Sequence, residues 1–178
     1  MKILRDKAIM LRVRNPKQIT TAIPNSKELP MNKVIVKWGM DEVLSLKSLN
    51  IKVPSPITGR YSWPGQYKPF AHQKDTSSFM TLNKKSFCFN EQGTGKTASA
   101  IWAADYLLTQ GKIKRVLVIC PLSIMDSAWR NDLFSFAMHR TVDVAHGGKE
   151  KRKKIINSGA EFVIINYDGV EVVKDEIA

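Results

Sequence analysis

The stretch Cys88–Leu108, "CFNEQGTGKTASAIWAADYLL", joins an apolar run to a glycine-containing turn and then to a helical pattern. Gly93 and Gly95 allow a sharp turn and a close approach of the backbone to a ligand. The N–H groups of this turn would point into one concavity, at the start of a helix that begins near Lys96. We therefore predict a triphosphate site, in which Lys96 reaches the β- and γ-phosphates and the Thr97 hydroxyl ligates Mg²⁺.

The loop departs from the full phosphate-loop pattern at one position. The pattern G-x-x-x-x-G-K-[ST] places its first glycine at position 90, where this chain has Asn90. Kinases, GTPases and transport ATPases usually keep that glycine, whereas helicase-type loops commonly have only Gly-x-Gly-Lys-Thr. The departure favours a helicase-type loop, and another kind of phosphate-loop NTPase remains an alternative.

Strand and helix patterns alternate from Ala71 to the end of the chain. Alternation of this kind is typical of an α/β fold with a parallel sheet covered on both faces. The predicted strands are 86–90, 115–121, 141–146 and 161–167, and the predicted helices are 74–82, 96–109, 123–137 and 148–157. The expected fold is a partial P-loop lobe of the RecA-like kind, over residues 70–178.

A smaller α+β accessory domain is expected to precede this lobe, over residues 1–53. It has predicted strands at 7–13 and 33–38 and predicted helices at 15–23 and 40–51. Residues 54–69 are rich in proline, glycine and aromatic residues, so we predict a linker without regular structure. Its aromatic side chains are too apolar to remain in water, and we expect them to pack.

The net charge of +12 is unevenly distributed. Residues 1–70 contain 13 Lys and Arg against 4 Asp and Glu, whereas residues 71–178 contain 15 against 12. A basic N-terminal part indicates a polyanionic partner such as nucleic acid, and a merely solvated basic surface is the alternative.

The two cysteines and the hydropathy pattern indicate the compartment. Cys88 and Cys120 lie inside apolar runs, so we expect two reduced core residues. Apolar runs of about 18 residues, long enough to span a membrane, do not occur. We predict an intracellular protein without a membrane partner, cytoplasmic in a bacterium or a phage-infected host, with a nuclear location left open.

Four segments in order resemble the motifs of superfamily 2 helicases, more narrowly of Snf-type DNA translocases. They are "YKPFAHQKDTSSFM", "FNEQGTGKT", "VLVICPLSIMDSAW" and "FVIINYDGV", the last with Asn166 where the family has threonine. The resemblance covers about residues 66–178. Residues 1–53 more weakly resemble the HepA-related (HARP) domain that precedes such motors in annealing helicases.

The resemblance implies ATP and Mg²⁺ as cofactors and duplex or branched DNA as partner. Gln73 would recognise adenine, with Tyr67 or Phe70 stacking on it. Gln92, Gly93, Thr94, Gly95, Lys96, Thr97 and Ala98 would surround the nucleotide, with Lys96 and Thr97 catalytic and Thr97 at the metal. Ser123, Asn166 and Tyr167 would contact DNA. We expect Arg130 on a solvated helix face or in a salt bridge, and the basic cluster Lys149–Lys154 on a solvated helix face, with contact to a phosphate as the alternative.

Hydrolysis also needs acids that hold Mg²⁺ and orient water, and arginines that neutralise the phosphoryl group. The family supplies these groups on an Asp-Glu-Ala-His-like strand and on a second lobe. Asp175 and Glu176 come too soon after the strand at 161–167 to be those acids, because a parallel crossover needs a dozen or more residues. We predict a loop and the start of a helix there.

The absent acid-bearing strand would leave a hydrophobic sheet edge open, and the remainder of the motor or a partner protein would cover it. The expected activity is DNA-stimulated ATP hydrolysis by the whole motor, with residues 1–178 inactive alone. The alternatives are a DNA-binding module without ATPase activity and a protein-interaction partner.

Overall fold

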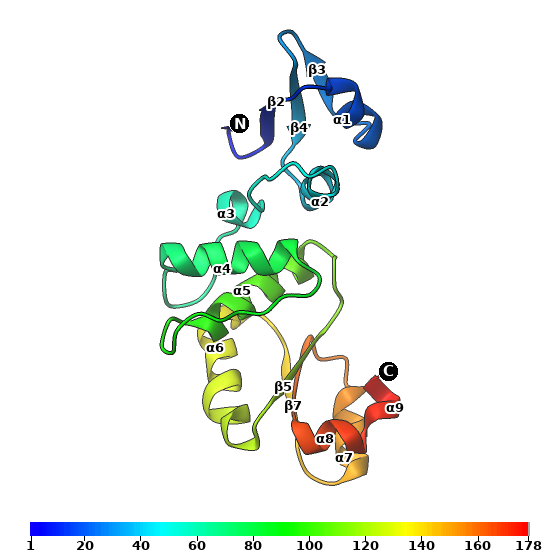
Figure 1. The fold of residues 1–178 in the computed structure, drawn as a ribbon. Coiled ribbons are helices and arrows are strands. Elements are labelled where there is room, and N and C mark those ends of the chain that lie inside the picture. Colours follow the sequence, from blue (N-terminus) through cyan, green and yellow to red (C-terminus); the bar gives the residue numbers. More distant parts are fainter. Residues whose placement is uncertain (178) are drawn as a thin grey trace. The chain divides into compact units, whose positions relative to one another are not determined.

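The computed structural model describes residues 1–177, which form two compact units. The first unit consists of Met1–Tyr61 and Ser78–Lys85, and the second contains Ser62–Ser77 and the described residues from Ser86 onward. The first unit is built on an antiparallel sheet and the second on a parallel sheet, so the chain is a mixed α/β protein (Figure 1).

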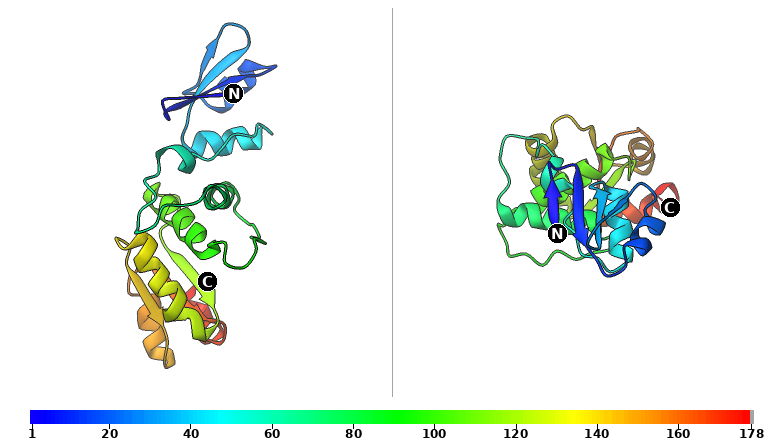
Figure 2. Two further views of the ribbon diagram at one scale, coloured as in Figure 1. Left: turned by 90° about the vertical axis from the view of Figure 1, so that its left-hand side faces the viewer. Right: turned by 90° about the horizontal axis from the view of Figure 1, so that it is seen from above.

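The sheet of the first unit has four strands, and Figure 2 shows them from two further directions. In spatial order they are β1 (Lys2–Leu4), β2 (Ala8–Arg12), β4 (Lys33–Lys37) and β3 (Lys27–Leu29), all antiparallel. Its helices are α1 (Pro16–Ala22), α2 (Met40–Ser48) and α3 (Ile57–Arg60). The predictions of β2, β4, α1 and α2 are confirmed. The edge strands β1 and β3 were missed because three residues are too few to show alternation.

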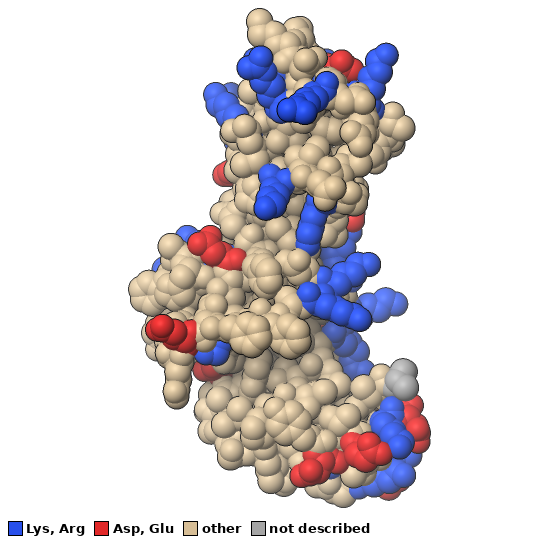
Figure 3. All heavy atoms as spheres, viewed as in Figure 1, with Lys and Arg blue, Asp and Glu red and all other residues tan. Residues whose placement is uncertain are grey.

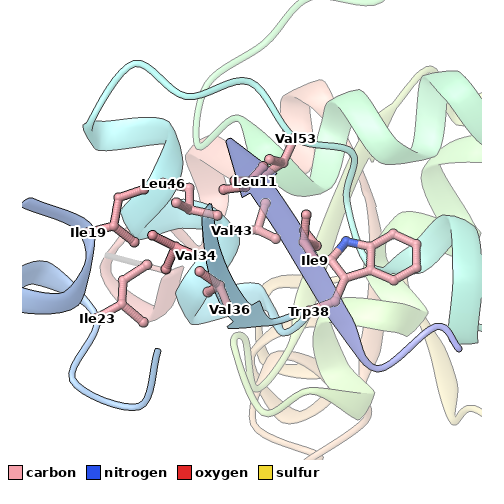
Figure 4. Close-up of a cluster of buried hydrophobic side chains, with 10 residues drawn as sticks. All are labelled: Ile9, Leu11, Ile19, Ile23, Val34, Val36, Trp38, Val43, Leu46 and Val53. Atoms are coloured by element: carbon pink, nitrogen blue, oxygen red, sulfur yellow. The ribbon is translucent and has the colours of Figure 1, made fainter. Parts of the chain in front are cut away.

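One face of this sheet forms the core of the first unit (Figure 4). Ile9 of β2 pairs with Val36 of β4, and Leu11 pairs with Val34, so all four side chains point to the same side. The buried cluster there consists of Ile9, Leu11, Ile19, Ile23, Val34, Val36, Trp38, Val43, Leu46 and Val53. Helices α1 and α2 therefore cover this one face.

The first half of the expected linker 54–69 is part of this packing. Ile57 is fully buried in the single helical turn α3, which the sequence did not predict. Trp38 Nε1 donates a hydrogen bond to the Pro54 carbonyl oxygen at 2.9 Å. A Cβ atom at Gly59 would lie 2.3 Å from the Trp38 ring, so only glycine fits beside the indole. The indole thus determines the path of the segment.

The second unit has a three-stranded parallel sheet in the order β5-β7-β6. The strands are β5 (Val116–Cys120), β6 (Val142–Ala145) and β7 (Phe162–Asn166). All five residues of β7 are buried, as expected for a central strand of a sheet covered on both faces. These three strands confirm the strands predicted at 115–121, 141–146 and 161–167 and the parallel sheet.

Helices cover both faces of the parallel sheet. On one face Phe162 and Ile164 pack with α5 (Lys96–Thr109) and α6 (Asn131–Ala137). On the other face Val163 and Ile165 pack with α7 (Lys149–Ile156) and residues near the C-terminus. The short helices α8 (Tyr167–Val172) and α9 (Lys174–Ile177) follow β7 directly, where the sequence predicted a loop first. The helix α4 (Ala71–Leu82) starts three residues earlier than predicted.

The predicted helix 123–137 is divided into three parts. A 3₁₀ turn η1 (Leu122–Ile124) and a π-helix η2 (Met125–Arg130) precede α6. Single π turns of this kind widen a helix and often occur at functional sites. Asp126 and Arg130 form an exposed ion pair of 3.3 Å, which confirms the expected solvated role of Arg130.

The predicted strand 86–90 is not formed. A strand requires a hydrogen-bonded neighbour, and the described sheet offers none to this segment. Phe87 and Phe89 are 80% and 88% exposed, and their rings stack on each other at 5.6 Å between centroids. Cys88 is therefore half-buried rather than a core residue, whereas Cys120 is buried as predicted; both thiols are free.

The aromatic residues of 61–70 behave differently from one another. Trp63 is buried, and its ring packs edge-on against Trp102 with 5.6 Å between the ring centroids. The prediction that the aromatic residues of this segment pack is confirmed for Trp63. Tyr67 and Phe70 are 61% and 68% exposed, so they are packed only in part. The Tyr67 ring lies 5.9 Å from that of Phe136, and the Phe70 ring stacks on His72 at 5.7 Å between centroids. Among the described residues, no helix is long and apolar enough to cross a membrane.

A buried polar network connects α5 to the loop before β6. Asp105 is 1% exposed and accepts hydrogen bonds from Arg140 Nε at 2.5 Å and His139 Nε2 at 2.9 Å. Arg140 Nη1 donates to Glu161 at 2.6 Å, and the Thr141 N–H donates to the same carboxylate at 3.0 Å. Burial acts to raise the pKa of Glu161, but the Thr141 N–H and Arg140 together lower it below its usual value.

This network predicts an acid-sensitive contribution to stability. The lowered pKa of Glu161 stabilises the fold above the unfolded-state value near 4.5, and this contribution disappears as pH falls through the lower folded-state value. At pH 7 we expect Glu161→Gln to lower the free energy of unfolding by about 1.5 kcal/mol. Urea titrations should show this difference shrinking below pH 4.5.

The matched control is Glu171→Gln, which changes a glutamate whose side chain is 77% exposed. It should leave the free energy of unfolding within about 0.5 kcal/mol at either pH. An equal effect of the two variants at pH 7 would contradict the role of the network.

Candidate nucleotide-binding site

The glycine turn adopts the conformation that the sequence predicted. Gly93 and Gly95 have φ angles of +78° and +75°, which side chains other than glycine rarely adopt. Gly95 is the N-cap of α5, which begins at Lys96 and has no side-chain cap. The first N–H groups of a helix have no partner within it, so α5 presents donors at the turn.

The N-terminal end of α4 supports the turn from outside. Gln73 is buried, donates from Nε2 to the Thr94 carbonyl oxygen at 3.2 Å and accepts from the Phe70 N–H at 3.0 Å. His72 Nε2 lies 3.1 Å from the same Thr94 oxygen. A Cβ atom at Gly95 would lie only 2.1 Å from Gln73 Nε2. The Gln73 side chain, for which the family resemblance predicts recognition of adenine, therefore also supports the turn.

Asn90, the departure from the glycine pattern, has a structural role. Its side-chain Nδ2 donates to Thr76 Oγ1 of α4 at 2.9 Å. The Ser77 hydroxyl of α4 donates to the Ser99 carbonyl oxygen of α5 at 2.9 Å. Sequence reasoning missed these contacts and that of His72, because polar residues on α4 carry no periodic signal.

The Lys96 ammonium lies over the turn rather than in free solvent. Its Nζ donates to the carbonyl oxygens of Asn90 at 3.0 Å and Glu91 at 2.8 Å. Thr94 Oγ1 also donates to the Glu91 oxygen, at 2.8 Å. The cation is thus held against the turn at the start of α5, where the predicted triphosphate would lie.

The remaining predicted nucleotide residues line the same segment. Gln92 is exposed before the turn, and Thr97 and Ala98 form the first turn of α5. A threonine hydroxyl here has the chemistry of a Mg²⁺ ligand, as do phosphate oxygens and water. Among residues 1–177, His, Cys, Asp and Glu form no cluster of three that would hold a metal by themselves.

The predicted DNA-contacting residues follow two neighbouring strands. Cys120 of β5 pairs with Asn166 of β7, so the carboxyl ends of both strands lie at one edge. Ser123 is exposed in η1 just after β5, and Tyr167 is 62% exposed at the start of α8. Asn166 differs, because it is only 7% exposed.

Asn166 is engaged by a buried arginine that the sequence placed on a solvated helix face. Arg152 Nη1 donates to Asn166 Oδ1 at 2.9 Å and to the Ala145 carbonyl oxygen at 2.6 Å, and its Nε donates to the Gly147 oxygen at 2.8 Å. A Cβ atom at Gly169 would lie 2.2 Å from Arg152 Nη1. Arg152 therefore joins the ends of β6 and β7, and its prediction as solvated is wrong.

Of the two acids near the C-terminus, Glu176 takes part in an ion pair. Glu176 lies 2.6 Å from Lys153, whose hydrogen bond and charge hold the pKa of Glu176 below its usual value. Asp175 is exposed in the first turn of α9.

Comparison with known proteins places this geometry in a family. The model of the SNF2-related domain matches residues 72–178, which include the turn, η1 and the end of β7. The chain belongs to the SNF2-related domain family. A solved structure described as the Sulfolobus solfataricus SWI2/SNF2 ATPase core in complex with dsDNA is 27% identical, with a TM-score of 0.51. The similarity covers 60% of this chain and 23% of that chain, and curated protein sequences gave no match.

The SNF2-related segment is thus part of the N-terminal RecA-like lobe of a superfamily 2 helicase of the Snf type. The chain spans less than a quarter of the length of the solved relative. That relative is described as an ATPase core.

The contact between Gly95 and Gln73 predicts different costs for two glycine substitutions. Gly93→Ala introduces only the positive φ cost of about 1–2 kcal/mol, because no atom lies within 4 Å of its Cβ position. Gly95→Ala adds a collision with Gln73 Nε2 and should lower the free energy of unfolding by at least about 1 kcal/mol more. Chemical denaturation of both variants measures the difference.

Gly111→Ala is a suitable reference, because Gly111 also has a positive φ, of +64°, and an open Cβ position. It should resemble Gly93→Ala. Equal stability of the Gly93→Ala and Gly95→Ala variants would show that Gln73 moves freely and does not support the turn.

Proposed function

We propose that the chain is a segment of an ATP-dependent DNA translocase, which couples ATP hydrolysis to movement on DNA for remodelling, branch migration or annealing. The observation that carries this proposal is the Lys96 ammonium, held at an uncapped helix start inside an SNF2-related domain. The nucleotide would be ATP with Mg²⁺, and Thr97 would be the metal ligand.

In this proposal the α4 side of the turn selects the base. Phe70 is exposed and its ring stacks on His72 with an interplanar angle of 11°, so the other face of Phe70 is open to an adenine ring. Gln73 would use its amide for the adenine edge while it holds Thr94. The Lys96 ammonium would exchange the carbonyl oxygens of Asn90 and Glu91 for phosphate oxygens.

Ser123, Asn166 and Tyr167 would face DNA at the common edge of β5 and β7. Ser123 and Tyr167 are exposed and suit direct phosphate contacts, which carry no sequence information. Asn166 would act through the backbone and the position of Arg152, because its side chain is already bonded. The solved relative is described in complex with dsDNA, which supports duplex DNA as the partner.

A further strand would complete the parallel sheet. On β5, Leu117 and Ile119 are 37% and 44% exposed, and Phe87 and Phe89 of the unpaired segment are more exposed still. An apolar cavity of ≈ 230 Å³ lies between α5 and β5. We propose that a strand from the remainder of the motor, or from a partner protein, pairs here and carries the acids that hydrolysis requires.

A DNA-binding module without ATPase activity is the second candidate, and the excess of basic residues over residues 1–70 favours it. The HARP-like character of the N-terminal residues and an intracellular location remain predictions.

ATP hydrolysis tests the leading candidate. The product of the longest natural reading frame that contains this chain should hydrolyse ATP only with DNA. We expect it to contain the carboxylates that hold Mg²⁺ and orient water, and the added DNA supplies the strand along which the motor would move. Lys96→Ala should lower the DNA-stimulated rate at least about 100-fold, since it removes the charge at the transferring phosphoryl group. Duplex, forked and single-stranded DNA should be compared, and residues 1–178 alone should be inactive.

Lys114→Ala is the matched control, because Lys114 is an exposed lysine between α5 and β5. It should keep the wild-type rate. A long product that binds DNA but never hydrolyses ATP would refute the motor and leave the binding module.

The open sheet edge predicts self-association of residues 1–178 when they are isolated. Exposed apolar strands pair with other chains, so light scattering should detect species larger than a monomer at micromolar concentration. Phe87→Ser with Phe89→Ser should shift the distribution toward monomer. Phe134→Ser, which removes a 63% exposed phenylalanine from α6, should not. A monomeric, cooperatively melting wild-type chain would contradict an open edge.

A further inference from the structure

The sheet of the first unit has a second face that its helices leave uncovered. The register places Lys2, Met10, Ile35 and Lys27 in one row across β1, β2, β4 and β3. Because side chains alternate along each strand, this row lies on the side opposite the buried Ile9, Leu11, Val34 and Val36. The side chains of the second face are Lys2, Leu4, Ala8, Met10, Arg12, Lys27, Leu29, Lys33, Ile35 and Lys37.

This face carries one sign of charge. It contains five basic residues and, within the four strands, no acidic residue, since Glu28 pairs with Val34 on the opposite side. Lys2, Arg12, Lys27 and Lys37 are exposed, and Lys33 is half-buried. Lys37 lies 3.9 Å from Glu42 and is partly neutralised. Over this unit, the view of Figure 3 shows more blue (Lys and Arg) than red (Asp and Glu).

Two of the cations face each other directly. Arg12 of β2 and Lys33 of β4 are cross-strand partners. Like charges in such positions destabilise a sheet, and an alternation of Lys or Arg with Glu would remove the repulsion. Neither side chain has a carboxylate partner among the ion pairs of the described residues. An arrangement that costs stability in the free protein is favourable when a polyanion lies across it.

We infer that the outer face of the β1-β2-β4-β3 sheet is a docking surface for the phosphate backbone of duplex DNA, read without regard to sequence. From Lys2 to Lys27 the row crosses three strand spacings, roughly 14 Å. A duplex segment of that length carries about eight phosphate charges, and those on the side toward the sheet, roughly half, are within reach of the cations. The aliphatic centre, Met10 and Ile35, would lie against sugars.

The side chains on the face distinguish duplex DNA from other polyanions. The face has no aromatic residue, and single-stranded nucleic acid is usually held by bases stacked on aromatic rings. It also has no Asn or Gln that would read base edges in a groove. The inference deepens the proposed function by giving the motor a second DNA contact, outside the matched domain at 72–178.

Fluorescence anisotropy with the full chain and a labelled 20-base-pair duplex, without nucleotide, tests the surface. The face variant combines Arg12→Gln, Lys27→Gln and Lys33→Gln, and the control variant combines Lys7→Gln, Lys17→Gln and Lys52→Gln, exposed lysines outside the face. Both variants lose three charges. The face variant should weaken binding at least about tenfold, and the slope of log affinity against log salt should fall by about 3. The control variant should lower the same slope by less than half as much as the face variant does.

Two further measurements separate this surface from its alternatives. The face variant should melt no lower than the wild type, because it removes the repulsion between Arg12 and Lys33, and two duplexes of unrelated sequence should bind equally. Equal affinities of the face and control variants for the duplex would overturn the inference. Tighter binding to single-stranded DNA than to duplex DNA would also overturn it, and so would binding to phosphatidylserine vesicles but not to DNA. ATP hydrolysis by the long product is a separate measurement that tests the translocase proposal. The anisotropy experiment tests only the docking surface, so either proposal can be refuted without the other.

Discussion

The parallel hydrogen-bond ladder on both sides of β7 is the constraint on which the second unit depends. All five residues of β7 are buried, so neither face of the strand can be solvated and each must be covered by helices. Parallel pairing aligns the carboxyl ends of the strands, which brings η1 and the start of α8 to one edge. The buried Arg152 strengthens this edge by bonding the end of β6 to the end of β7. The edge at which we propose a contact with DNA is therefore formed by backbone pairing.

The nucleotide site depends on a different kind of contact. The turn at Gly93 and Gly95 is not held by the sheet, since the preceding segment is unpaired; it is held by polar contacts from α4 to the turn and to α5. These contacts require a backbone that approaches the Gln73 amide more closely than a Cβ atom would allow. The glycine at position 95 therefore serves two purposes, the positive φ of the turn and the contact with its support. The Lys96 ammonium is positioned by the same turn through two carbonyl oxygens.

The two units use charge in different ways. In the second unit the strongest charges are buried and paired, as in the Asp105, Arg140 and Glu161 network, and they serve stability. In the first unit five basic side chains lie on a sheet face that has no acidic residue of its own, and two of them oppose each other across strands. Of the five, Lys37 lies near an acid, Glu42. The exposed basic side chains of the first unit therefore suit a polyanionic partner, whereas the paired charges of the second unit do not. The proposed nucleotide site and the proposed surface for the phosphate backbone are thus supported by separate cores.

Several elements carry local signals that can be read from the sequence. Alternation of apolar residues identified β2 and β4, strand patterns in the second half of the chain identified β5, β6 and β7, helical patterns identified α5 and α7, and the glycine turn with Lys96 predicted the phosphate site. The pairing of segments and the burial of polar groups depend instead on contacts between elements. Residues 86–90 have the composition of a strand and yet form none, because a strand exists only where another strand completes its hydrogen bonds. Arg152 and Asn166 look solvent-facing or ligand-facing in the sequence and are buried together, because the pairing of β6 with β7 brings the ends of both strands to the Arg152 side chain. The uncovered basic face likewise depends on strand register, which places Arg12 opposite Lys33 and is not encoded in either strand alone.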